Sequence, residues 1–503
     1  MTASAQPLEK LSEREERFER SRRRAGVVLG PAIFLIVFFA PLSGLTPEAH
    51  RLAAVMAAVV TLWITEALPM PVTALLGAAA CVVLRVAPAK EVFAPFADPL
   101  MFLFIGAFIV ARAIFVHDLH RRLAYAVLSL RWVGARPSRI LLVFGAVTAF
   151  VSAWISNTAT TAMMFAIGLS ILAFLFEHGG TTPLALRFAT GIMLMTSFAA
   201  SIGGLATPIG TPPNIIGLGF IRQMVGVEFP FFKWAMIGVP VVLTLYLFLY
   251  VYMNALTAKA LPEISGGREM LLREREGLGP WTRAQKSTLA AFVITVVLWV
   301  VPGIVALVAG AESDAYKAIN ARVPEAVAAL VGAGLLFLLP GDDEKRAITW
   351  EDAVKIDWGV VLLYGGGFAL GVLSFETGLA EAMGRGITSL LPIHSSFGLL
   401  VASVIAATLL SETTSNTASA NMIVPVVIAI ANAAGMDPLE PALGATFGAS
   451  LGFMLPVSTP CNAIVYGSGY VPLGRMIRYG ILLDVAGIIV IVAMVRLLVP
   501  VLR

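Results

Sequence analysis

The tripeptide Ser-Asn-Thr occurs twice in this chain, each time within a long apolar stretch. The first copy occupies residues 156–158 and the second residues 415–417, about half the chain apart. A second polar break follows each copy, with the sequence Gly-Thr-Pro-Pro-Asn at 210–214 and Ser-Thr-Pro-Cys-Asn at 458–462. Paired polar breaks at membrane depth are typical of duplicated folds that build one site from two half-sites. The pattern therefore predicts two such half-sites.

The composition indicates a polytopic membrane protein. Hydrophobic residues make up 58% of the 503 residues and charged residues only 13%, whereas soluble domains carry about 25% charged residues. Many apolar runs approach or exceed the ~20 residues that a spanning helix needs. We attribute the net charge of +4 to Lys and Arg in cytoplasmic loops, so it does not indicate nucleic-acid binding. The two cysteines, Cys81 and Cys461, imply no disulfide framework.

The apolar runs predict an all-α protein with eleven transmembrane helices and two re-entrant hairpins. The expected spans lie near residues 25–42, 51–67, 72–87, 99–116, 187–222, 236–256, 287–309, 324–340, 358–374, 442–470 and 481–499. The stretches 140–175 and 396–435 carry the Ser-Asn-Thr copies near their middles. Each half of these stretches has ~16–20 residues, which is marginal for a crossing. We therefore expect both stretches to be hairpins with the tripeptide at the tip.

The distribution of Lys and Arg predicts the orientation of the two hairpins. Residues 9–24 contain twelve charges and are expected to form a cytoplasmic amphipathic segment, 1–24, before the first span. Five arginines precede the first hairpin, whereas no Lys or Arg lies between Arg385 and Glu412 at the second. By the positive-inside rule the hairpins enter from opposite faces, with Lys317 and Arg322 as exceptions. Inverted repeats, 25–256 and 287–503, joined by a cytoplasmic linker, 257–286, satisfy this pattern.

Prolines predict a helix break in each half. Pro212, Pro213 and Pro460 lack a backbone donor, so the spans 187–222 and 442–470 should unwind there. Unpaired backbone groups at membrane depth are tolerated where they line a cavity or hold an ion. A proline kink alone would be unremarkable in a membrane helix, but two matched breaks, each following a hairpin tip, favour a binding site.

The chemistry of these motifs is neutral and rich in oxygen. No charged residue lies between Arg187 and Arg222, and between Arg385 and Arg475 the chain carries only three carboxylates. An anion could still bind at broken-helix N-termini and at amide and hydroxyl donors. Carbonyl, hydroxyl and amide oxygens also suit a hard cation such as Na⁺. A bound cation would supply the positive charge that the motifs lack.

At these residues the chain resembles the divalent anion/sodium symporter family of di- and tricarboxylate transporters. The matching segments begin at residues 152, 201, 210, 411 and 458, with the sequences Ser-Ala-Trp-Ile-Ser-Asn-Thr-Ala-Thr, Ser-Ile-Gly-Gly, Gly-Thr-Pro-Pro-Asn, Ser-Glu-Thr-Thr-Ser-Asn-Thr-Ala and Ser-Thr-Pro-Cys-Asn-Ala. Together and in order these segments are highly specific. The resemblance implies a homodimer in the inner cell membrane that moves its site by an elevator-type mechanism.

The resemblance also implies roles for individual residues. One Na⁺ would bind among Ser152, Ser156, Asn157 and Gly210, and a second among Ser411, Thr414, Asn416 and Ser458. The substrate carboxylates would contact Ser156, Asn157, Thr158, Thr211, Pro212, Ser415, Asn416, Thr417, Thr459 and Pro460. Two positions depart from the family pattern: Ser458 replaces a common Ala or Gly, and Cys461 replaces a second proline.

Two intramembrane or near-membrane carboxylates admit alternative interpretations. Glu412 lies beside the second tripeptide, where it could tune the second ion site or carry a proton, or could cap the hairpin turn. Glu66, near the expected cytoplasmic end of the second span, is interpreted as a structural hydrogen-bond acceptor for the loop backbone.

The expected function is Na⁺-coupled symport of a small dianion, with C4-dicarboxylates such as succinate as the leading substrates. A Na⁺-independent dicarboxylate exchanger, or citrate, 2-oxoglutarate or sulfate as substrate, remains open. An intramembrane enzyme would need a catalytic constellation, and the apolar stretches contain neither HExxH nor a His–Asp cluster. A channel fits poorly with closed, proline-broken hairpin sites. We therefore expect a transporter without catalytic residues.

Overall fold

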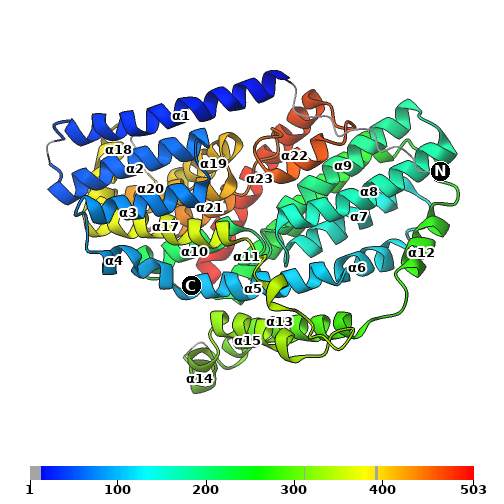
Figure 1. The fold of residues 1–503 in the computed structure, drawn as a ribbon. Coiled ribbons are helices and arrows are strands. Elements are labelled where there is room, and N and C mark those ends of the chain that lie inside the picture. Colours follow the sequence, from blue (N-terminus) through cyan, green and yellow to red (C-terminus); the bar gives the residue numbers. More distant parts are fainter. Residues whose placement is uncertain (1–12, 43, 311, 391–394, 503) are drawn as a thin grey trace.

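The computed structural model describes residues 13–42, 44–310, 312–390 and 395–502, and all regular elements within them are helical (Figure 1). The first half contains α1 (Glu13–Phe39), α2 (Pro47–Thr65), α3 (Met70–Val83), α4 (Ala89–Phe93), the 3-10 turn η1 (Ala94–Ala97), α5 (Pro99–Val116), α6 (Leu119–Leu128), α7 (Pro137–Ser152), α8 (Asn157–Gly179), α9 (Pro183–Gly203), α10 (Pro212–Phe220), the π-turn η2 (Ile221–Val225), α11 (Phe231–Met253) and the π-turn η3 (Asn254–Ala258).

The linker and the second half contain α12 (Gly267–Gly277), α13 (Arg283–Ala309), α14 (Asp314–Arg322), α15 (Glu325–Leu338), α16 (Trp350–Ala353), α17 (Trp358–Glu376), α18 (Leu379–Leu390), α19 (Ser396–Thr413), α20 (Asn416–Ala433), α21 (Leu439–Gly448), α22 (Pro460–Tyr466) and α23 (Leu473–Leu502). Within the described residues, ten helices are long and apolar enough to cross a membrane, or eleven if α14 and α15 form one bent span. This all-helical, multi-span architecture confirms the predicted fold class.

The charged N-terminal segment and the first expected span form one continuous helix. α1 runs from Glu13 to Phe39, so its basic turn at residues 20–24 is part of the same helix as the apolar part. Residues 1–12 of the expected segment 1–24 lie outside the described residues. α1 packs along α2, as the parallel dark-blue helices at the top of Figure 1 show.

Both Ser-Asn-Thr copies lie at the turns of helical hairpins. α7 and α8 meet at residues 153–156, and α19 and α20 meet at residues 414–415. The two hairpins reach the middle of the molecule from opposite sides (Figure 1), the arrangement that inverted repeats predict. The arms are longer than expected: α8, with 23 residues, and α19 and α20, with 18 residues each, are long and apolar enough to span a membrane by themselves.

The two proline-containing spans are broken as predicted, but the unwound residues lie directly before the prolines, which form the first turns of the next helices. The first becomes α9 and α10, separated by residues 204–211, and the second becomes α21 and α22, separated by residues 449–459. α9 is the most enclosed of the candidate spans, because 89% of its apolar window is buried inside the molecule. It approaches α7 closely at its C-terminal end, where a Cβ on Gly203 would lie 2.1 Å from the carbonyl oxygen of Ala149.

The structure adds helices that the apolar pattern did not predict, including the amphipathic α6, which precedes the first hairpin, and α12 in the linker.

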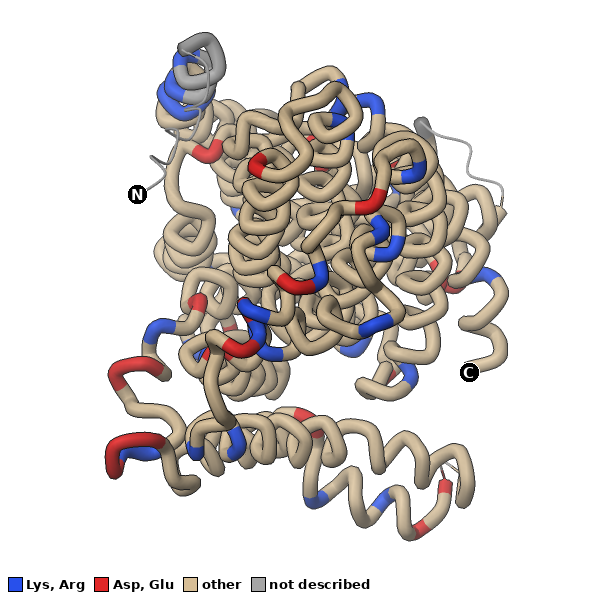
Figure 2. Tube along the Cα trace, turned by 90° about the vertical axis from the view of Figure 1, so that its right-hand side faces the viewer, with Lys and Arg blue, Asp and Glu red and all other residues tan. Residues whose placement is uncertain are grey.

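Charged residues lie mostly outside the apolar helices. Figure 2 views the molecule from the side opposite to the tip of the α7–α8 hairpin. The blue and red segments lie mostly in loops and at helix ends, whereas most of the helical tube is tan. Charged residues at the periphery, with uncharged helices between them, are the distribution expected for a protein whose helices are embedded in a membrane.

Candidate substrate and ion site

The two hairpin tips repeat one hydrogen-bond pattern. In the first hairpin the Ser152 hydroxyl donates to Oδ1 of Asn157 at 2.8 Å, and in the second the Ser411 hydroxyl lies 2.8 Å from Oδ1 of Asn416. Each bond links the last turn of the first arm to the first residue of the second arm. The amide oxygens are thereby fixed beside the turn, where they can face an ion or substrate.

The serine of each tripeptide caps the second arm. The Ser156 hydroxyl accepts the backbone N–H of Ala159 at 3.3 Å, and the Ser415 hydroxyl accepts that of Ala418 at 3.2 Å. Serine is a preferred N-cap because it satisfies one of the backbone donors left free at a helix start. The remaining N–H groups of α8 and α20 point toward the tip, so each tip presents a partial positive charge.

The two helix breaks are held by equivalent asparagines. Asn214, in the first turn of α10, donates through Nδ2 to the carbonyls of Gly204 (2.9 Å) and Thr207 (2.8 Å). Asn462, in the first turn of α22, donates to the carbonyls of Gly452 (3.0 Å) and Leu455 (2.9 Å), so the sequence spacings are identical. The sequence analysis treated these asparagines only as part of the break motifs. Their fully buried amides turn two unwound segments into defined loops.

The residues of the first predicted Na⁺ site are brought together around Gly204. A Cβ at Gly204 would lie 2.4 Å from Oδ1 of Asn157, and a Cβ at Gly210 would lie 2.5 Å from the carbonyl oxygen of Gly204. Ser152 bonds to the same Asn157 oxygen. The hairpin tip and the helix break are therefore in contact, and their donor set consists of oxygen atoms.

The second predicted Na⁺ site has the same layout with Gly452 between its parts. A Cβ at Gly452 would lie 3.4 Å from Oδ1 of Asn416 and 3.5 Å from Cβ of Ser458. Asn416 also donates to the carbonyl of Ser450 at 3.4 Å. Thr414, the C-cap residue of α19, directs its hydroxyl to the carbonyl of Leu410 at 2.9 Å. Thr414 thus lies at the tip, but its hydroxyl is engaged within α19.

The two halves differ at a pair of buried carboxylates, Glu412 and Asp484, in the second half. Glu412 accepts the backbone N–H of Met454 at 2.8 Å and a hydrogen bond from the hydroxyl of Ser458, which also contacts the Glu412 carbonyl at 3.1 Å. Glu412 therefore braces the second helix break instead of capping its own hairpin turn. Asp484 of α23 lies beside Glu412 and the Phe453 backbone, and its side chain is buried.

Asp484 was not predicted from the sequence, although a lone carboxylate in an apolar span is a signal of function.

The first half lacks the acidic residue and the serine of the second half. The equivalent of Glu412 in the first hairpin is Ala153, and the first break has Gly210 where the second has Ser458. Gly238 of α11 and Gly480 of α23 both lie against their respective breaks. The Ser458 departure from the family pattern is thus part of a hydrogen-bonded group that only the second half contains.

The predicted substrate residues line the same two junctions. Thr211 is the buried N-cap of α10, and its hydroxyl makes no capping bond, whereas the Thr459 hydroxyl accepts the N–H of Asn462 at 3.1 Å. Pro212 and Pro460 are the first residues of α10 and α22. Thr417 follows Asn416 in the first turn of α20.

The halves interlock across the middle of the protein. α22 of the second half packs on α8 and α9 of the first, while α10 of the first half packs on α20 and α21 of the second. The Ser197 hydroxyl in α9 donates to Oδ1 of Asn462 at 2.6 Å. Cys461, the residue in place of a second proline, lies against Thr158 and Thr161 of α8. The first tip therefore adjoins the second break, so the two half-sites form one region.

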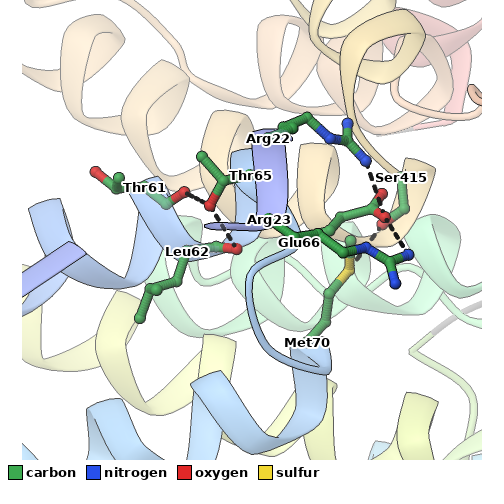
Figure 3. Close-up of polar contacts among 8 residues, drawn as sticks. All are labelled: Arg22, Arg23, Thr61, Leu62, Thr65, Glu66, Met70 and Ser415. Atoms are coloured by element: carbon green, nitrogen blue, oxygen red, sulfur yellow. Dashed lines mark hydrogen bonds and ion pairs between the residues drawn. The ribbon is translucent and has the colours of Figure 1, made fainter. Parts of the chain in front are cut away.

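A cavity of about 560 Å³ reaches this region from the side of α1. Three predicted substrate residues of the second half, Ser415, Thr459 and Pro460, contribute to its wall together with arginines of α1. Figure 3 shows how Arg22 and Arg23 converge on Glu66, close to Ser415. Glu66 thus pairs with two arginines instead of with the loop backbone. A larger cavity of about 930 Å³, beside α6 and α12, contains none of the predicted site residues, so we assign it no role in binding.

Solved structures with the same fold are membrane transporters. The chain aligns with the YdaH transporter of Alcanivorax borkumensis with a TM-score of 0.55 and 13% identity, over 95% of this chain and 96% of the other. It aligns with MtrF of Neisseria gonorrhoeae with a TM-score of 0.53 and 15% identity, over 84% of this chain and 85% of the other. At these identities the likeness concerns the fold alone.

The sequence identifies the family directly. Residues 22–502 match the family described as the sodium:sulfate symporter transmembrane region. The chain is 34% identical over 484 residues to a sodium-dependent dicarboxylate transporter of Staphylococcus saprophyticus and 33% identical over 485 residues to one of Staphylococcus aureus; these alignments cover 94% and 95% of this chain and 91% of each relative. The chain therefore belongs to the sodium:sulfate symporter family, the divalent anion/sodium symporters. Membership confirms a multi-pass transporter that is not an enzyme, with Na⁺ as the co-transported ion.

Proposed function

We propose that this protein couples Na⁺ to the uptake of C4-dicarboxylates such as succinate by alternating access. The observation that carries the proposal is the duplicated junction of hairpin tip and helix break. The Staphylococcus relatives are named sodium-dependent dicarboxylate transporters, which supports the choice of a dicarboxylate among the dianions of the family.

In this proposal the two tips and the two breaks hold the two carboxylates of one substrate. The first carboxylate would meet Ser156, Asn157 and Thr158 with Thr211 and Pro212, and the second would meet Ser415, Asn416 and Thr417 with Thr459 and Pro460. Helix N-termini, amides and hydroxyls are neutral donors, so they stabilise an anion without the desolvation cost of a buried Arg or Lys.

We further propose that each junction holds one Na⁺. The cages would be Ser152, Ser156, Asn157 and Gly210 in the first half, and Ser411, Thr414, Asn416 and Ser458 in the second. Gly204 and Gly452 allow the tip and the break in each half to approach closely, which brings hard oxygen donors to one place. A cation beside the bound dianion strengthens both interactions, and such coupling is reciprocal.

The remaining parts of the proposal concern the whole protein. They are an elevator-type movement, a homodimer, a cytoplasmic N-terminus and a place in the inner cell membrane. The opposite approach of the two hairpins supports the movement, and the bacterial origin of the named relatives supports a cell membrane. The distribution of Lys and Arg supports the cytoplasmic N-terminus, and the homodimer rests on the family resemblance.

Radiolabelled succinate uptake by purified protein in liposomes tests the function. We expect uptake into empty vesicles under an inward Na⁺ gradient and its loss when K⁺ replaces Na⁺. Uptake that ignores Na⁺ but requires internal dicarboxylate would contradict symport and indicate an exchanger. Citrate, 2-oxoglutarate and sulfate as competitors then rank the substrates.

Two variants test the site. Asn157→Ala and Asn416→Ala should each abolish Na⁺-driven uptake while the protein is still produced and reconstituted. Asn432→Ala, at an exposed position on the second hairpin, is the matched control and should transport normally. Wild-type uptake by both site variants would refute the proposed half-sites.

A further inference from the structure

We propose that Glu412 and Asp484 form a binding site for one further Na⁺ in the second half of the protein. The inference rests on the proposed function, because it adds one coupled ion to the two proposed cages. It does not rest on the symmetry that carries those cages, since the first half has apolar residues in place of this pair.

The two carboxylates lie together in the interior without a basic partner. Glu412 is 2% exposed and Asp484 is 4% exposed, and the two carboxyl groups face each other where α23 packs on α19. In the described part of the chain, the groups that act on Asp484 are Glu412 and the Phe453 backbone, and none is a Lys, Arg or His. Two adjacent buried carboxylates repel each other and are costly to ionise. The pair therefore needs a positive charge beside it.

The oxygen atoms of the two side chains are unequally satisfied. Glu412 accepts through both oxygens, Oε1 from the Met454 backbone N–H at 2.8 Å and Oε2 from the Ser458 hydroxyl, which is the pattern of an ionised carboxylate. Both oxygens of Asp484 are buried, and neither has a hydrogen bond of good geometry with a described residue, although the Phe453 backbone lies beside them. Buried polar atoms without partners are costly, so these two oxygens are free to bind a ligand.

The first half shows that the fold does not require the pair. Ala153 stands in the first hairpin where the second has its glutamate. α11 contacts the first break at Gly238, as α23 contacts the second break at Gly480. Four residues after these glycines, α11 has Val242 and α23 has Asp484. An apolar Ala and Val thus occupy the places of the two carboxylates, which indicates that the acidic pair serves a function of the second half alone.

The available donors favour Na⁺ as the ligand. The carboxylate oxygens of Asp484 and Glu412 and the hydroxyl of Ser458 are hard oxygen donors, which suit Na⁺ better than a transition metal. A proton would satisfy one Asp484 oxygen and leave the other without a partner, whereas a cation can bind both. Ser458 also lines the cavity of about 560 Å³, so an ion can reach the pair from that cavity. Carboxylates inside a membrane commonly mark ion pathways.

The dependence of stability on Na⁺ measures the number of bound ions without transport. The melting temperature of purified full-length protein in detergent is measured without succinate over a series of Na⁺ concentrations, with K⁺ keeping the ionic strength constant. Above its Kd, each bound ion adds an equal increment of stability for each tenfold rise in Na⁺. Asp484→Asn should therefore lower the slope to roughly two thirds of the parent value, because two of the three proposed ions remain.

Two further variants complete this experiment. Asp484→Val copies Val242 of the first half and should show the same reduced slope, so the test does not depend on one substitution. Glu376→Gln removes an exposed carboxylate at the end of α17 and should keep the parent slope. If both Asp484 variants keep the parent slope, with their melting temperatures shifted equally at every Na⁺ concentration, the inference is overturned.

The coupling ratio provides an independent measurement. In liposomes with a fixed Na⁺ gradient, the membrane potential at which net succinate flux is zero gives the number of Na⁺ ions per succinate. Asp484→Asn should couple one Na⁺ fewer than the parent, and Glu376→Gln should couple the same number. An unchanged number in Asp484→Asn would contradict the inference. Parent uptake driven by a proton gradient alone, and lost in Asp484→Asn, would assign the pair to a proton and also overturn it.

The two measurements separate this inference from the proposed function. If the parent transports no succinate but its Na⁺ slope depends on Asp484, the proposed function is wrong and the ion site stands. If Na⁺ drives succinate uptake but neither measurement depends on Asp484, the ion site is wrong and the proposed function stands.

Discussion

At the scale of single residues, the strongest constraints on the site are hydrogen bonds that cross a helix break. Asn214 and Asn462 each bind two carbonyls that lie seven and ten residues earlier in the chain. An unwound segment inside a membrane protein is stable only if its backbone groups find partners. The two asparagines provide those partners, so we regard them as positioning residues for the motifs that contact substrate.

Replacement of either asparagine by alanine should destabilise the protein more than a surface substitution. Asn214→Ala and Asn462→Ala each leave two buried carbonyls without donors, at a cost of about 1–3 kcal/mol. The melting temperature in detergent measures the effect, and Asn432→Ala on the exposed side of α20 is the control. Equal melting temperatures for all three variants would show that the asparagines do not support the breaks.

Glu412 provides a second test at this scale. Its carboxylate accepts hydrogen bonds from the Met454 backbone and the Ser458 hydroxyl, so Glu412→Ala should lower the melting temperature, with Glu376→Ala at an exposed position as control. Combining Glu412→Ala with Ser458→Ala should cost less than the two single losses added, because the residues share one interaction. Strict additivity would indicate that the carboxylate and the hydroxyl act independently.

At the scale of elements, hairpins and broken helices act as pairs. Each tip lies against the break of its own half at a glycine, Gly204 or Gly452, and at Gly204 there is no room for a side chain. The helical pieces beyond the breaks, α10 and α22, then cross to the other half. The elements that form one substrate site therefore come from positions far apart in the sequence.

Gly210→Ala tests the close approach at the first break. Its Cβ would lie 2.5 Å from the Gly204 carbonyl oxygen and 2.9 Å from the Gly204 Cα, which are backbone atoms that cannot move aside. We expect a loss of about 1–3 kcal/mol or more and weaker stabilisation by Na⁺. Gly474→Ala, with open space around its Cβ, should have little effect on melting temperature. A Gly210→Ala protein that responds to Na⁺ like the parent would contradict the first ion cage.

At the scale of the whole molecule, the interlocked halves predict that ion and substrate binding are linked. Saturating Na⁺ should raise the melting temperature, and succinate should raise it further only when Na⁺ is present. A ligand at 100 times its Kd stabilises by about 2.7 kcal/mol, which is readily measured in a thermal scan. Replacement of Na⁺ by K⁺ at the same ionic strength is the control. Equal stabilisation by succinate in K⁺ would argue against coupling.

The sequence by itself determined the hairpins, the helix breaks and the family motifs, because these depend on local chemistry. Long apolar runs require helices in a membrane. Prolines at residues 212 and 460 begin the helices that follow the two breaks, and serines at residues 156 and 415 cap the second arms of the hairpins. Because these effects act over a few residues, both hairpins, both breaks and the family motifs could be read from one chain. The length of α8 and the continuous α1 were less predictable, since a boundary depends on small differences in propensity and packing.

Only the tertiary structure decided which distant residues meet. Asp484 lies beside Glu412, Asn462 receives a hydrogen bond from Ser197, and the arginines of α1 border a cavity shared with Ser415. Each pair is separated by tens to hundreds of residues, so no local periodicity or motif spacing encodes it. Contacts of this kind arise when packed helices bury their faces together, and packing depends on the shapes of all the helices at once.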